Sequence, residues 1–419
     1  MARTRRKILL VAYACRPGES SEREVGWKWA NLIQARHDVT VLTRASHKPH
    51  IEAWIKAQPQ QGQGLEFIYY DLPACWGRRF KKGERGLYLY YICWSFFAIL
   101  TARRQNHNHR FEITHFLTFG TLLWPQFAFL MNTRYVLGPV GGGEREPLSL
   151  RRAFSPVGQI KIYARRLVQA SLLLNPVYWA NLWRADHILA RTRETLAMLP
   201  APMRAKSSLL LETGVPEGVE TPAAKAAPEA PLAIVSVGRL ITTKFNPLLL
   251  EALKEFKDAW GKSFRFTIIG DGPERARLEA LRDALGLEEV VFTGKLPGAK
   301  VLETLRKSDI YFSTTMKEGG TWAFFEAISC RVPIVCLKVN GPDMIVGDGC
   351  GIKVPSGRYA FTKSALAAGL LELAENPAKR ENFAEKALTY IEQNYSWHHV
   401  QDRIDAVYQQ VMAEKGAGA

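Results

Sequence analysis

The sequence predicts an α/β protein with two doubly wound halves, each a parallel sheet covered by helices on both faces. Short, continuously apolar runs alternate with amphipathic helical segments from residue 7 to residue 215, and the alternation starts again at residue 231. Between the halves, residues 216–230 are rich in Pro and Ala and offer little to bury, which is typical of a linker.

Length and composition agree with two globular domains. The chain has 419 residues, of which 47% are hydrophobic and 23% charged. It is therefore too long for one ordinary core and too apolar for a disordered chain. Its 56 Lys and Arg residues exceed its 40 Asp and Glu residues, and the net charge of +16 predicts an acidic partner such as a phosphorylated ligand or an anionic membrane. No nucleic-acid-binding signature accompanies the charge, so we expect no nucleic acid partner.

In the first half, a strand at Lys7–Ala14 is followed by a helix at Val25–Ala35, a strand at Asp38–Arg44 and a helix near Ile51–Ala57. The later strands are expected at Leu65–Leu72, Glu112–Phe119, Arg134–Val140, Ala185–Arg193 and Ser208–Val215.

In the second half, strands are expected in PLAIVSVGRL, FRFTIIGDG, VVFTG, IYFSTT and PIVCLKV, with helices at Pro247–Trp260 and around Leu278–Leu285. The end of the chain, Ala378–Glu414, is expected to be largely helical. Ligands of such sheets bind beyond the carboxyl ends of the strands, so the functional residues should lie in the loops that follow strands.

Two basic and aromatic segments interrupt this alternation. The basic cluster Gly77–Gly86 precedes the apolar run Leu87–Leu100, and the segment Arg151–Trp183 has the same character. Fourteen apolar residues are too few to span a bilayer. Both segments are either helices with a broad buried face or helices that lie on an anionic membrane.

The stretch EGGTWAFFEAISCRVPIV (Glu318–Val335) carries the main functional signal. If Thr321 begins a helix, the backbone N–H groups of Gly319, Gly320 and Thr321 form its positive end, which is a site for an anion. Glu318 then lies in the loop and Glu326 lies one to two turns into the helix. An unpaired buried carboxylate is costly, so both are interpreted as ligand contacts.

Other strand ends in this half add cations and glycines. Arg239 and Lys244 follow the first strand, and the second strand ends in GDGP. Together with FTG at Phe292–Gly294 and with GPDMIVGDGCGIKVP at Gly341–Pro355, this ordered set resembles the second domain of the retaining nucleotide-sugar glycosyltransferases of family 4, over nearly all of residues 231–356. The resemblance implies the GT-B fold, two facing Rossmann-like domains with the active site in the cleft between them.

The resemblance also implies a role for each matching residue. Arg239, Lys244 and the amides of Gly319–Thr321 would neutralise the diphosphate leaving group. Glu318 would contact hydroxyls of the donor sugar and Glu326 those of the ribose, since a carboxylate accepts two hydrogen bonds from a diol. The implied catalytic set is Glu318, His115, Arg239 and Lys244, and further donor contacts are implied for Gly18, Gly270, Gly294 and Leu296.

The first half resembles the same family more faintly. YACRPGESSEREVGW and GPVGGGE (Gly138–Glu144) are similar to segments of a subgroup, although only Gly18 stands where a double glycine is common. Gly141, Gly142 and Glu144 are the implied acceptor contacts, while GPVGGGE alone is equally typical of a tight turn. His115 would face the donor sugar, or else it is a hydrogen-bonded core histidine.

The predicted organisation is an acceptor domain at 1–215, a linker at 216–230, a nucleotide-sugar domain at 231–390 and a C-terminal helix at 391–419 that packs back toward the first domain. The predicted activity is retaining transfer of a hexose from a nucleoside diphosphate sugar, UDP being the commoner donor in the family, to a lipid-linked or cell-surface glycan precursor. A soluble enzyme acting on a small natural product and a non-catalytic nucleotide-sugar-binding subunit are the alternatives.

The cellular setting and the cofactors are expectations from residue spacing. The six cysteines lack CxxC pairs and metal-ligand spacing, and the first apolar run has the length of a strand rather than of a signal peptide core. We expect a cytoplasmic protein, with peripheral contact to the inner face of the membrane as an option. We expect no metal and no other cofactor, because the nucleotide sugar is a substrate.

Overall fold

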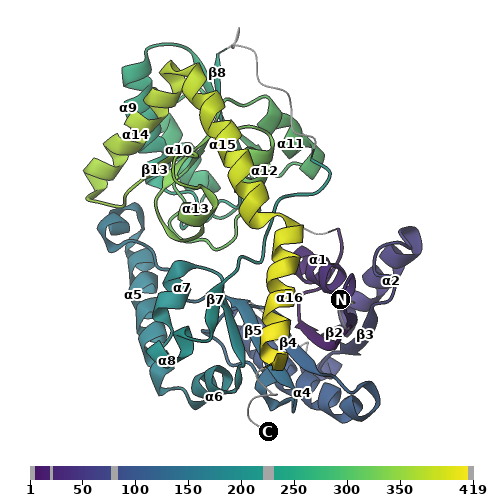
Figure 1. Cartoon of the computed structure of the whole chain (residues 1–419). Coiled ribbons are helices and arrows are strands. Elements are labelled where there is room, and N and C mark those ends of the chain that lie inside the picture. Colours follow the sequence, from purple (N-terminus) through teal and green to yellow (C-terminus); the bar gives the residue numbers. More distant parts are fainter. Residues whose placement is uncertain (1–4, 19–21, 77–83, 220–230, 414–419) are drawn as a thin grey trace. The chain divides into compact units, whose positions relative to one another are not determined.

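The computed structural model describes residues 5–18, 22–76, 84–219 and 231–413 (Figure 1). Its contacts divide the chain into two compact units. Unit 1 comprises Met1–Gly143, Leu167–Glu212 and Trp397–Ala419, and unit 2 comprises Glu144–Arg166 and Thr213–Ser396. The division differs from the predicted boundaries at 144–166, which belongs to unit 2. The division also assigns the last helix to unit 1. Most of the predicted linker, residues 220–230, lies outside the described residues.

Unit 1 is built on a parallel sheet whose described strands have the order β3-β2-β1-β4-β5-β6-β7. The strands are β1 (Lys7–Ala12), β2 (Asp38–Arg44), β3 (Glu66–Tyr70), β4 (Ile113–Thr118), β5 (Arg134–Val140), β6 (His187–Ala190) and β7 (Ser207–Leu209). The described helices are α1 (Glu22–Gln34), η1 (Ala45–His47), α2 (Lys48–Ala57), α4 (Glu84–His109), η2 (Ala128–Leu130), η4 (Leu172–Leu174), α6 (Pro176–Arg184), α7 (Arg193–Met198), α8 (Ala201–Arg204) and α16 (Trp397–Ala413).

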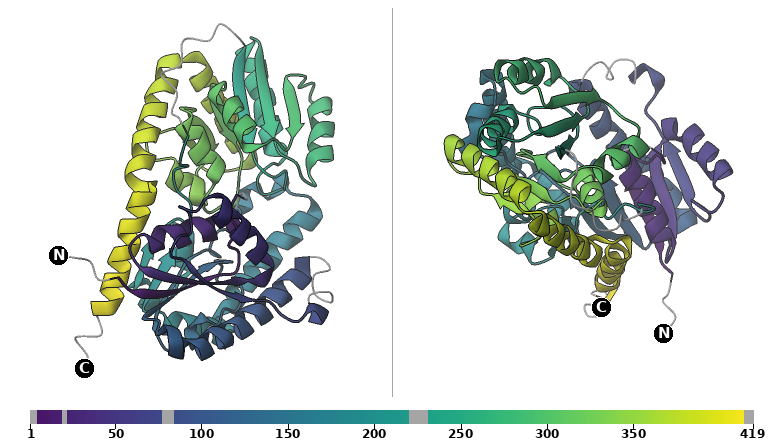
Figure 2. Two further views of the ribbon diagram at one scale, coloured as in Figure 1. Left: turned by 90° about the vertical axis from the view of Figure 1, so that its right-hand side faces the viewer. Right: turned by 90° about the horizontal axis from the view of Figure 1, so that it is seen from above.

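Helices cover both faces of this sheet. In the left panel of Figure 2, α1 lies along one face and α4 along the other. Leu9, Val11 and Tyr13 pack with Tyr90 and Trp94 of α4 in one apolar cluster. Central strands are therefore buried on both sides, and every residue of β4 is buried. This burial explains why the strands of the sequence are continuous apolar runs rather than alternating ones.

Unit 2 is built on a second parallel sheet, whose described strands have the order β10-β9-β8-β11-β12-β13. The strands are β8 (Leu232–Val237), β9 (Phe264–Ile269), β10 (Val290–Gly294), β11 (Ile310–Ser313), β12 (Ile334–Leu337) and β13 (Ile352–Val354). The described helices are η3 (Leu148–Ala153), α9 (Pro247–Trp260), α10 (Arg275–Ala284), α11 (Gly298–Arg306), α12 (Trp322–Ser329), α13 (Asn340–Ile345), α14 (Tyr359–Glu375) and α15 (Pro377–Tyr395). Helix α5 (Pro156–Ser171) is continuous, and the division between the units falls between Arg166 and Leu167.

The predicted fold class, two parallel α/β sheets in one chain, is confirmed. Local signals account for individual elements. Helix α9 has Pro247 at its first position, where a missing N–H costs nothing, and ends at Gly261 with a φ of 63°, a left-handed conformation that glycine adopts without strain. Within the described part of the chain, no helix combines the length and the apolar composition needed to cross a membrane.

Candidate functional site

An ion pair joins two strand-end loops of unit 2. Lys244 follows β8, and Glu318 follows β11, its parallel neighbour in the sheet. Because neighbouring parallel strands end at the same edge, the two side chains meet, with Lys244 Nζ 2.7 Å from Glu318 Oε2. The side chains are only 19% and 20% exposed. Glu318 therefore has a partner in the protein itself, which the sequence argument from unpaired carboxylates did not anticipate.

The start of α12, beside this pair, leaves its donors unsatisfied. The amides of Gly319, Gly320 and Thr321 donate no hydrogen bond to any residue that the structure describes. Thr321 occupies the cap position, yet its side chain makes no capping bond, and its hydroxyl is buried without a described partner. A cap residue normally satisfies one of these donors. The positive end of α12 is therefore open to an anionic ligand.

Close backbone contacts explain the glycines of this loop. A Cβ atom on Gly320 would lie 2.0 Å from Thr213 Oγ1, and one on Gly341 would lie 1.6 Å from the carbonyl oxygen of Gly319. The Gly341 amide also donates to the Glu318 carbonyl oxygen over 3.0 Å. Sequence reasoning did not assign Thr213 or Gly341 to the site, although Gly341 begins one of the motifs that carry the resemblance.

A pocket opens at this sheet edge. Its lining includes Lys244, Tyr311, Ser313, Thr315 and Thr321, so a positive charge and several hydroxyl groups face one small space. Such a lining suits phosphate or sugar oxygen atoms. Tyr311, Ser313 and Thr315 were not singled out from the sequence, although they lie in and just after the predicted strand IYFSTT.

Glu326 is the fifth residue of α12 and is half-buried. Its carboxylate has no hydrogen bond or ion pair among the described residues, and burial raises the pKa of this carboxyl above its ordinary value. A carboxylate held partly out of water without a partner is ready to accept hydrogen bonds from a ligand. Its position one turn into the helix agrees with the position that the sequence predicts.

The other residues predicted in unit 2 surround the same edge. Arg239 is exposed in the loop after β8 and forms no ion pair within the described ranges. Gly270 packs so closely that a Cβ atom would lie 1.8 Å from the Gly238 carbonyl oxygen, and its amide donates to Gly294. Gly270 is therefore needed for backbone packing, while Gly294 has a φ of 72°, a left-handed conformation that favours glycine. Leu296 lies half-exposed in the loop after β10.

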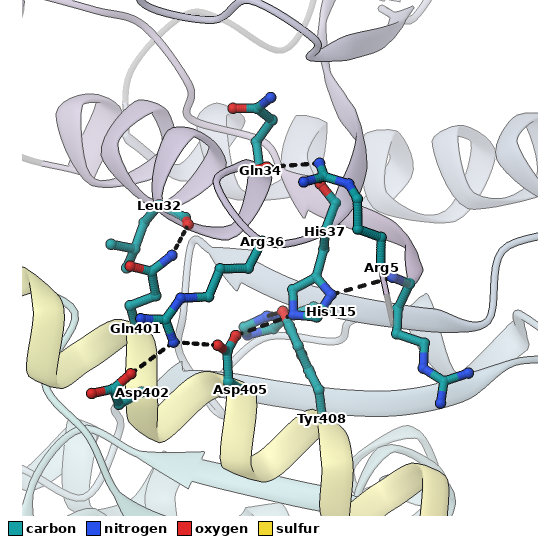
Figure 3. Close-up of polar contacts among 11 residues, drawn as sticks. Arg5, Leu32, Gln34, Arg36, His37, His115, Gln401, Asp402, Asp405 and Tyr408 are labelled. Carbon is teal, nitrogen blue, oxygen red and sulfur yellow. Dashed lines mark hydrogen bonds and ion pairs between the residues drawn. The ribbon is translucent and has the colours of Figure 1, made fainter. Parts of the chain in front are cut away.

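His115 is a core residue of unit 1, as in the second of the two interpretations that the sequence left open, and its catalytic role stays a prediction. It lies in the middle of β4 and is completely buried (Figure 3). Its Nδ1 is 2.6 Å from the hydroxyl of Tyr408 in α16, and its Nε2 is 2.6 Å from the carbonyl oxygen of Gly138. Burial, opposed by the bond to Gly138, lowers the pKa of His115 to about 4. The neutral ring therefore donates to Gly138, accepts from Tyr408 and fastens α16 to the sheet.

Polar groups predicted as contacts in unit 1 are likewise engaged. The Gly18 amide donates to Glu24 Oε2 over 3.0 Å. The Gly141 amide donates to the Gly120 carbonyl oxygen, and the Gly142 carbonyl oxygen accepts from Gln169 Nε2. Glu144, the third predicted acceptor contact, is buried, and the division between the units falls directly before it.

The candidate site is made of side chains and amides of this chain. Among the described residues, no group of three His, Cys, Asp or Glu side chains is arranged to hold a metal ion. The expectation that no metal is required stays a prediction.

Comparison with known proteins shows which family the second half of the chain resembles. Residues 220–389 match the family described as "Glycosyl transferases group 1". The chain is similar to this family over about two fifths of its length. It is 32% identical over 150 residues to the putative colanic acid biosynthesis glycosyltransferase WcaL of Escherichia coli, covering 34% of this chain and 37% of WcaL. It is 27% identical over 264 residues to the 2-deoxystreptamine glucosyltransferase of Streptomyces kanamyceticus, covering 59% of this chain and 66% of that enzyme.

Solved structures extend the likeness to both units. Sucrose-phosphate synthase from Thermosynechococcus elongatus matches with a TM-score of 0.65 and 16% identity, covering 98% of this chain and all of that one. Anabaena HepE in complex with UDP-glucose matches with a TM-score of 0.58 and 13% identity, covering 97% and 100%. The chain therefore has the predicted GT-B fold. It spans between about one third and two thirds of the length of the curated relatives it matches.

Proposed function

We propose that this protein is a retaining glycosyltransferase that moves a hexose from a UDP-sugar to a hydroxyl group of a lipid-linked or cell-surface glycan precursor. The observation that carries the proposal is the Lys244–Glu318 pair beside the uncapped start of α12. A cation, three amides without acceptors and a carboxylate meet there, which is the set of groups that a diphosphate joined to a sugar requires.

The donor would change the partners of these groups. The diphosphate takes the amides of Gly319–Thr321 and attracts Lys244, so Glu318 becomes available to the sugar hydroxyls. Glu326, which has no described partner, accepts from the ribose diol. In this proposal the protein supplies charge stabilisation rather than a strong base.

The transfer itself follows from that arrangement. The bond between the anomeric carbon and the phosphate oxygen breaks, and its electron pair stays on the diphosphate. The acceptor hydroxyl attacks from the face that the leaving group vacates, so the configuration is retained, and its proton passes to a phosphate oxygen. The amides and Lys244 stabilise the negative charge that grows on the diphosphate.

The donor base and the absence of a metal requirement are parts of this proposal. The structure of Anabaena HepE contains UDP-glucose, which supports UDP as the nucleotide of the donor. The cations Lys244 and Arg239 can take the place of a metal at the diphosphate.

The acceptor class rests on relatives with different substrates. WcaL is named for colanic acid biosynthesis, which supports a glycan precursor as the acceptor. A location at the cytoplasmic face of the membrane is a further part of this proposal. The 2-deoxystreptamine glucosyltransferase supports the alternative, a small natural product as acceptor. Profiling transfer from one donor to lipid-linked and to soluble acceptors separates the two.

Two measurements test the proposal. In a thermal-shift panel of UDP, GDP, ADP and TDP, UDP should raise the melting temperature most, because a ligand that binds only the folded state stabilises it. Donor hydrolysis by Glu318→Ala should then fall about a hundredfold, a typical loss for one group that stabilises a transition state. Glu303→Ala, in an exposed ion pair with Lys300, is the matched control and should keep the wild-type rate. Equal hydrolysis by wild type and Glu318→Ala would refute the assignment.

A further inference from the structure

Helix α5 has most of its large apolar side chains on the outside, Ile162 being the buried exception. Ile160 and Leu167, seven residues apart on one face, are 68% and 72% exposed, and Val157, Tyr163 and Val168 on the same broad face are also exposed. A surface helix of a globular protein normally turns such residues toward the core. The exposed side of α5 is therefore an unpartnered apolar face.

Polar bonds fix the orientation of this helix. Gln169 is buried, and its Nε2 donates to the Gly142 carbonyl oxygen over 2.6 Å. Arg166 donates to the Glu146 carbonyl oxygen over 3.0 Å, and Arg165 forms an ion pair with the Glu146 carboxylate. The inward side of α5 thus carries Ile162, which is buried in the apolar core of unit 2, together with amide and guanidinium groups. These contacts leave Val157, Ile160, Leu167 and Val168 on the outer side.

The apolar surface continues beyond the helix. Leu174 of η4 is 85% exposed, and Leu173 and Trp183 are exposed as well. Trp179 donates from its indole to the Leu173 carbonyl oxygen and stacks on Trp183, so aromatic rings border this stretch. Of the thirteen large hydrophobic residues that are exposed among those described, eight lie between Val157 and Trp183. We call the surface formed by these eight exposed residues the α5 face.

The charge around the α5 face has one sign. Residues 147–185 contain six Lys and Arg residues and no Asp or Glu. Two of the six, Arg165 and Arg166, are bound to Glu146. The other four are exposed and form no ion pair with a described carboxylate: Arg151, Arg152, Lys161 and Arg184. A surface of this kind complements an anionic partner.

We infer that the α5 face docks on the headgroup region of an anionic lipid membrane. Aliphatic side chains insert at the boundary of the acyl chains, tryptophan and tyrosine lie at the headgroup level, and the unpaired cations meet lipid phosphates. This inference deepens the membrane-linked part of the proposed function. It favours Arg151–Trp183 over Leu87–Leu100, where α4 exposes only Leu87, Leu89 and Phe97 and the preceding residues 77–83 lie outside the described residues.

The test is co-sedimentation of the full chain with vesicles of phosphatidylcholine alone and of an equimolar mixture with phosphatidylglycerol. Wild type should bind the mixed vesicles at least tenfold more tightly, and added salt should weaken the binding. Leu167→Asp with Leu174→Asp should lose about tenfold or more of that affinity. Lys161→Glu with Arg184→Glu should lose binding to the mixed vesicles selectively.

Matched controls separate this face from general stickiness and from the transferase activity. Phe361→Asp changes an exposed large hydrophobic residue of α14, and Lys56→Glu changes an exposed lysine of α2, so both should bind as wild type does. All the substitutions are on the surface and should leave the unfolding midpoint unchanged. Glu318→Ala should bind vesicles normally, so failure of the proposed function and failure of this inference are distinguishable.

Two results would overturn the inference. One is vesicle binding that is equal with and without phosphatidylglycerol or unaffected by the substitutions on the α5 face. The other is a concentration-dependent dimer, seen by sedimentation equilibrium, that the Leu167→Asp and Leu174→Asp pair abolishes, because the occupant of the face would then be a second copy of the chain.

Discussion

The loops after the strands of the two sheets differ in how their polar groups are satisfied. In unit 1, the amides and side chains that were predicted to touch ligands, those of Gly18, His115 and Gly141, bind other groups of the same unit. In unit 2, the start of α12 and the carboxylate of Glu326 have no described partners. Similar sheets can thus carry similar motifs, while the unsatisfied groups of unit 2 are what distinguishes its strand-end loops as a place for a ligand.

The largest effect is expected from His115→Phe, which removes both hydrogen bonds of the buried His115 side chain. It leaves the Tyr408 hydroxyl and the Gly138 carbonyl oxygen buried without partners, so denaturant unfolding should show a loss of about 3 kcal/mol at pH 7. Donor hydrolysis measured at low temperature should stay within about threefold of wild type, as is typical when no contact to the reacting groups is removed. A stable variant without activity would restore the catalytic role for His115 and contradict the comparison.

The same residue predicts a dependence of stability on acid. The pKa of His115 is lowered from about 6.5 to about 4 in the folded protein. Between pH 6.5 and pH 4, the His115 side chain is therefore protonated in the unfolded chain and neutral in the folded one. The free energy of unfolding is therefore unaffected by this group above pH 6.5 and decreases as the pH falls below that value, by about 3 kcal/mol at pH 4. His47, whose pKa burial also lowers to about 4, adds to the same trend. Unfolding midpoints measured from pH 7 to pH 4 should fall less steeply in His115→Phe than in wild type.

Lys244→Met tests whether the strand-end loops of unit 2 bind the donor diphosphate. The substitution removes a charge-assisted contact to the proposed diphosphate, so calorimetry should show UDP affinity reduced by about tenfold. Lys363→Met is the matched control, because Lys363 forms a similar ion pair, with Glu255 at 2.8 Å, away from the strand-end loops. If both variants lost affinity equally, the ion pair would be a structural feature and not part of a site.

Thr321→Val tests whether an unsatisfied group is kept for a ligand. The hydroxyl has no described partner, so its replacement by a methyl group should leave stability unchanged or raise it by up to about 1 kcal/mol. UDP affinity should fall about fivefold if the hydroxyl binds a phosphate oxygen. Thr362→Val should behave oppositely, because the Thr362 hydroxyl accepts from the Gly357 amide and its loss affects stability but not affinity. Unchanged UDP affinity in Thr321→Val would remove this hydroxyl from the proposed site.

The sequence predicted features that depend on neighbouring residues or on the order of strands. Asp38–Arg44 and Arg134–Val140 form strands with the predicted bounds, because parallel strands buried on both faces are continuous apolar runs. That Lys244 and Glu318 lie at one edge of the sheet followed from the rule that parallel strands end at the same edge, whereas the ion pair between them was not predicted. The partner of His115 could not be predicted, because Tyr408 lies 293 residues away on a helix whose return to unit 1 depends on packing.

Gly18→Asn is expected to have the smallest effect, and it tests the unit 1 side of the comparison most directly. The backbone of Gly18 has a φ of 72°, which asparagine tolerates better than most residues, although its Cβ atom would press on Trp54 at 2.8 Å. A modest loss of stability, about 1 kcal/mol, should follow. UDP affinity should stay within about twofold, because the Gly18 amide already donates to Glu24 and has no hydrogen left for a phosphate oxygen. A loss of tenfold or more would mean that the donor displaces Glu24 from the Gly18 amide. The hydrogen bond between Gly18 and Glu24 would then be a feature of the ligand-free protein only.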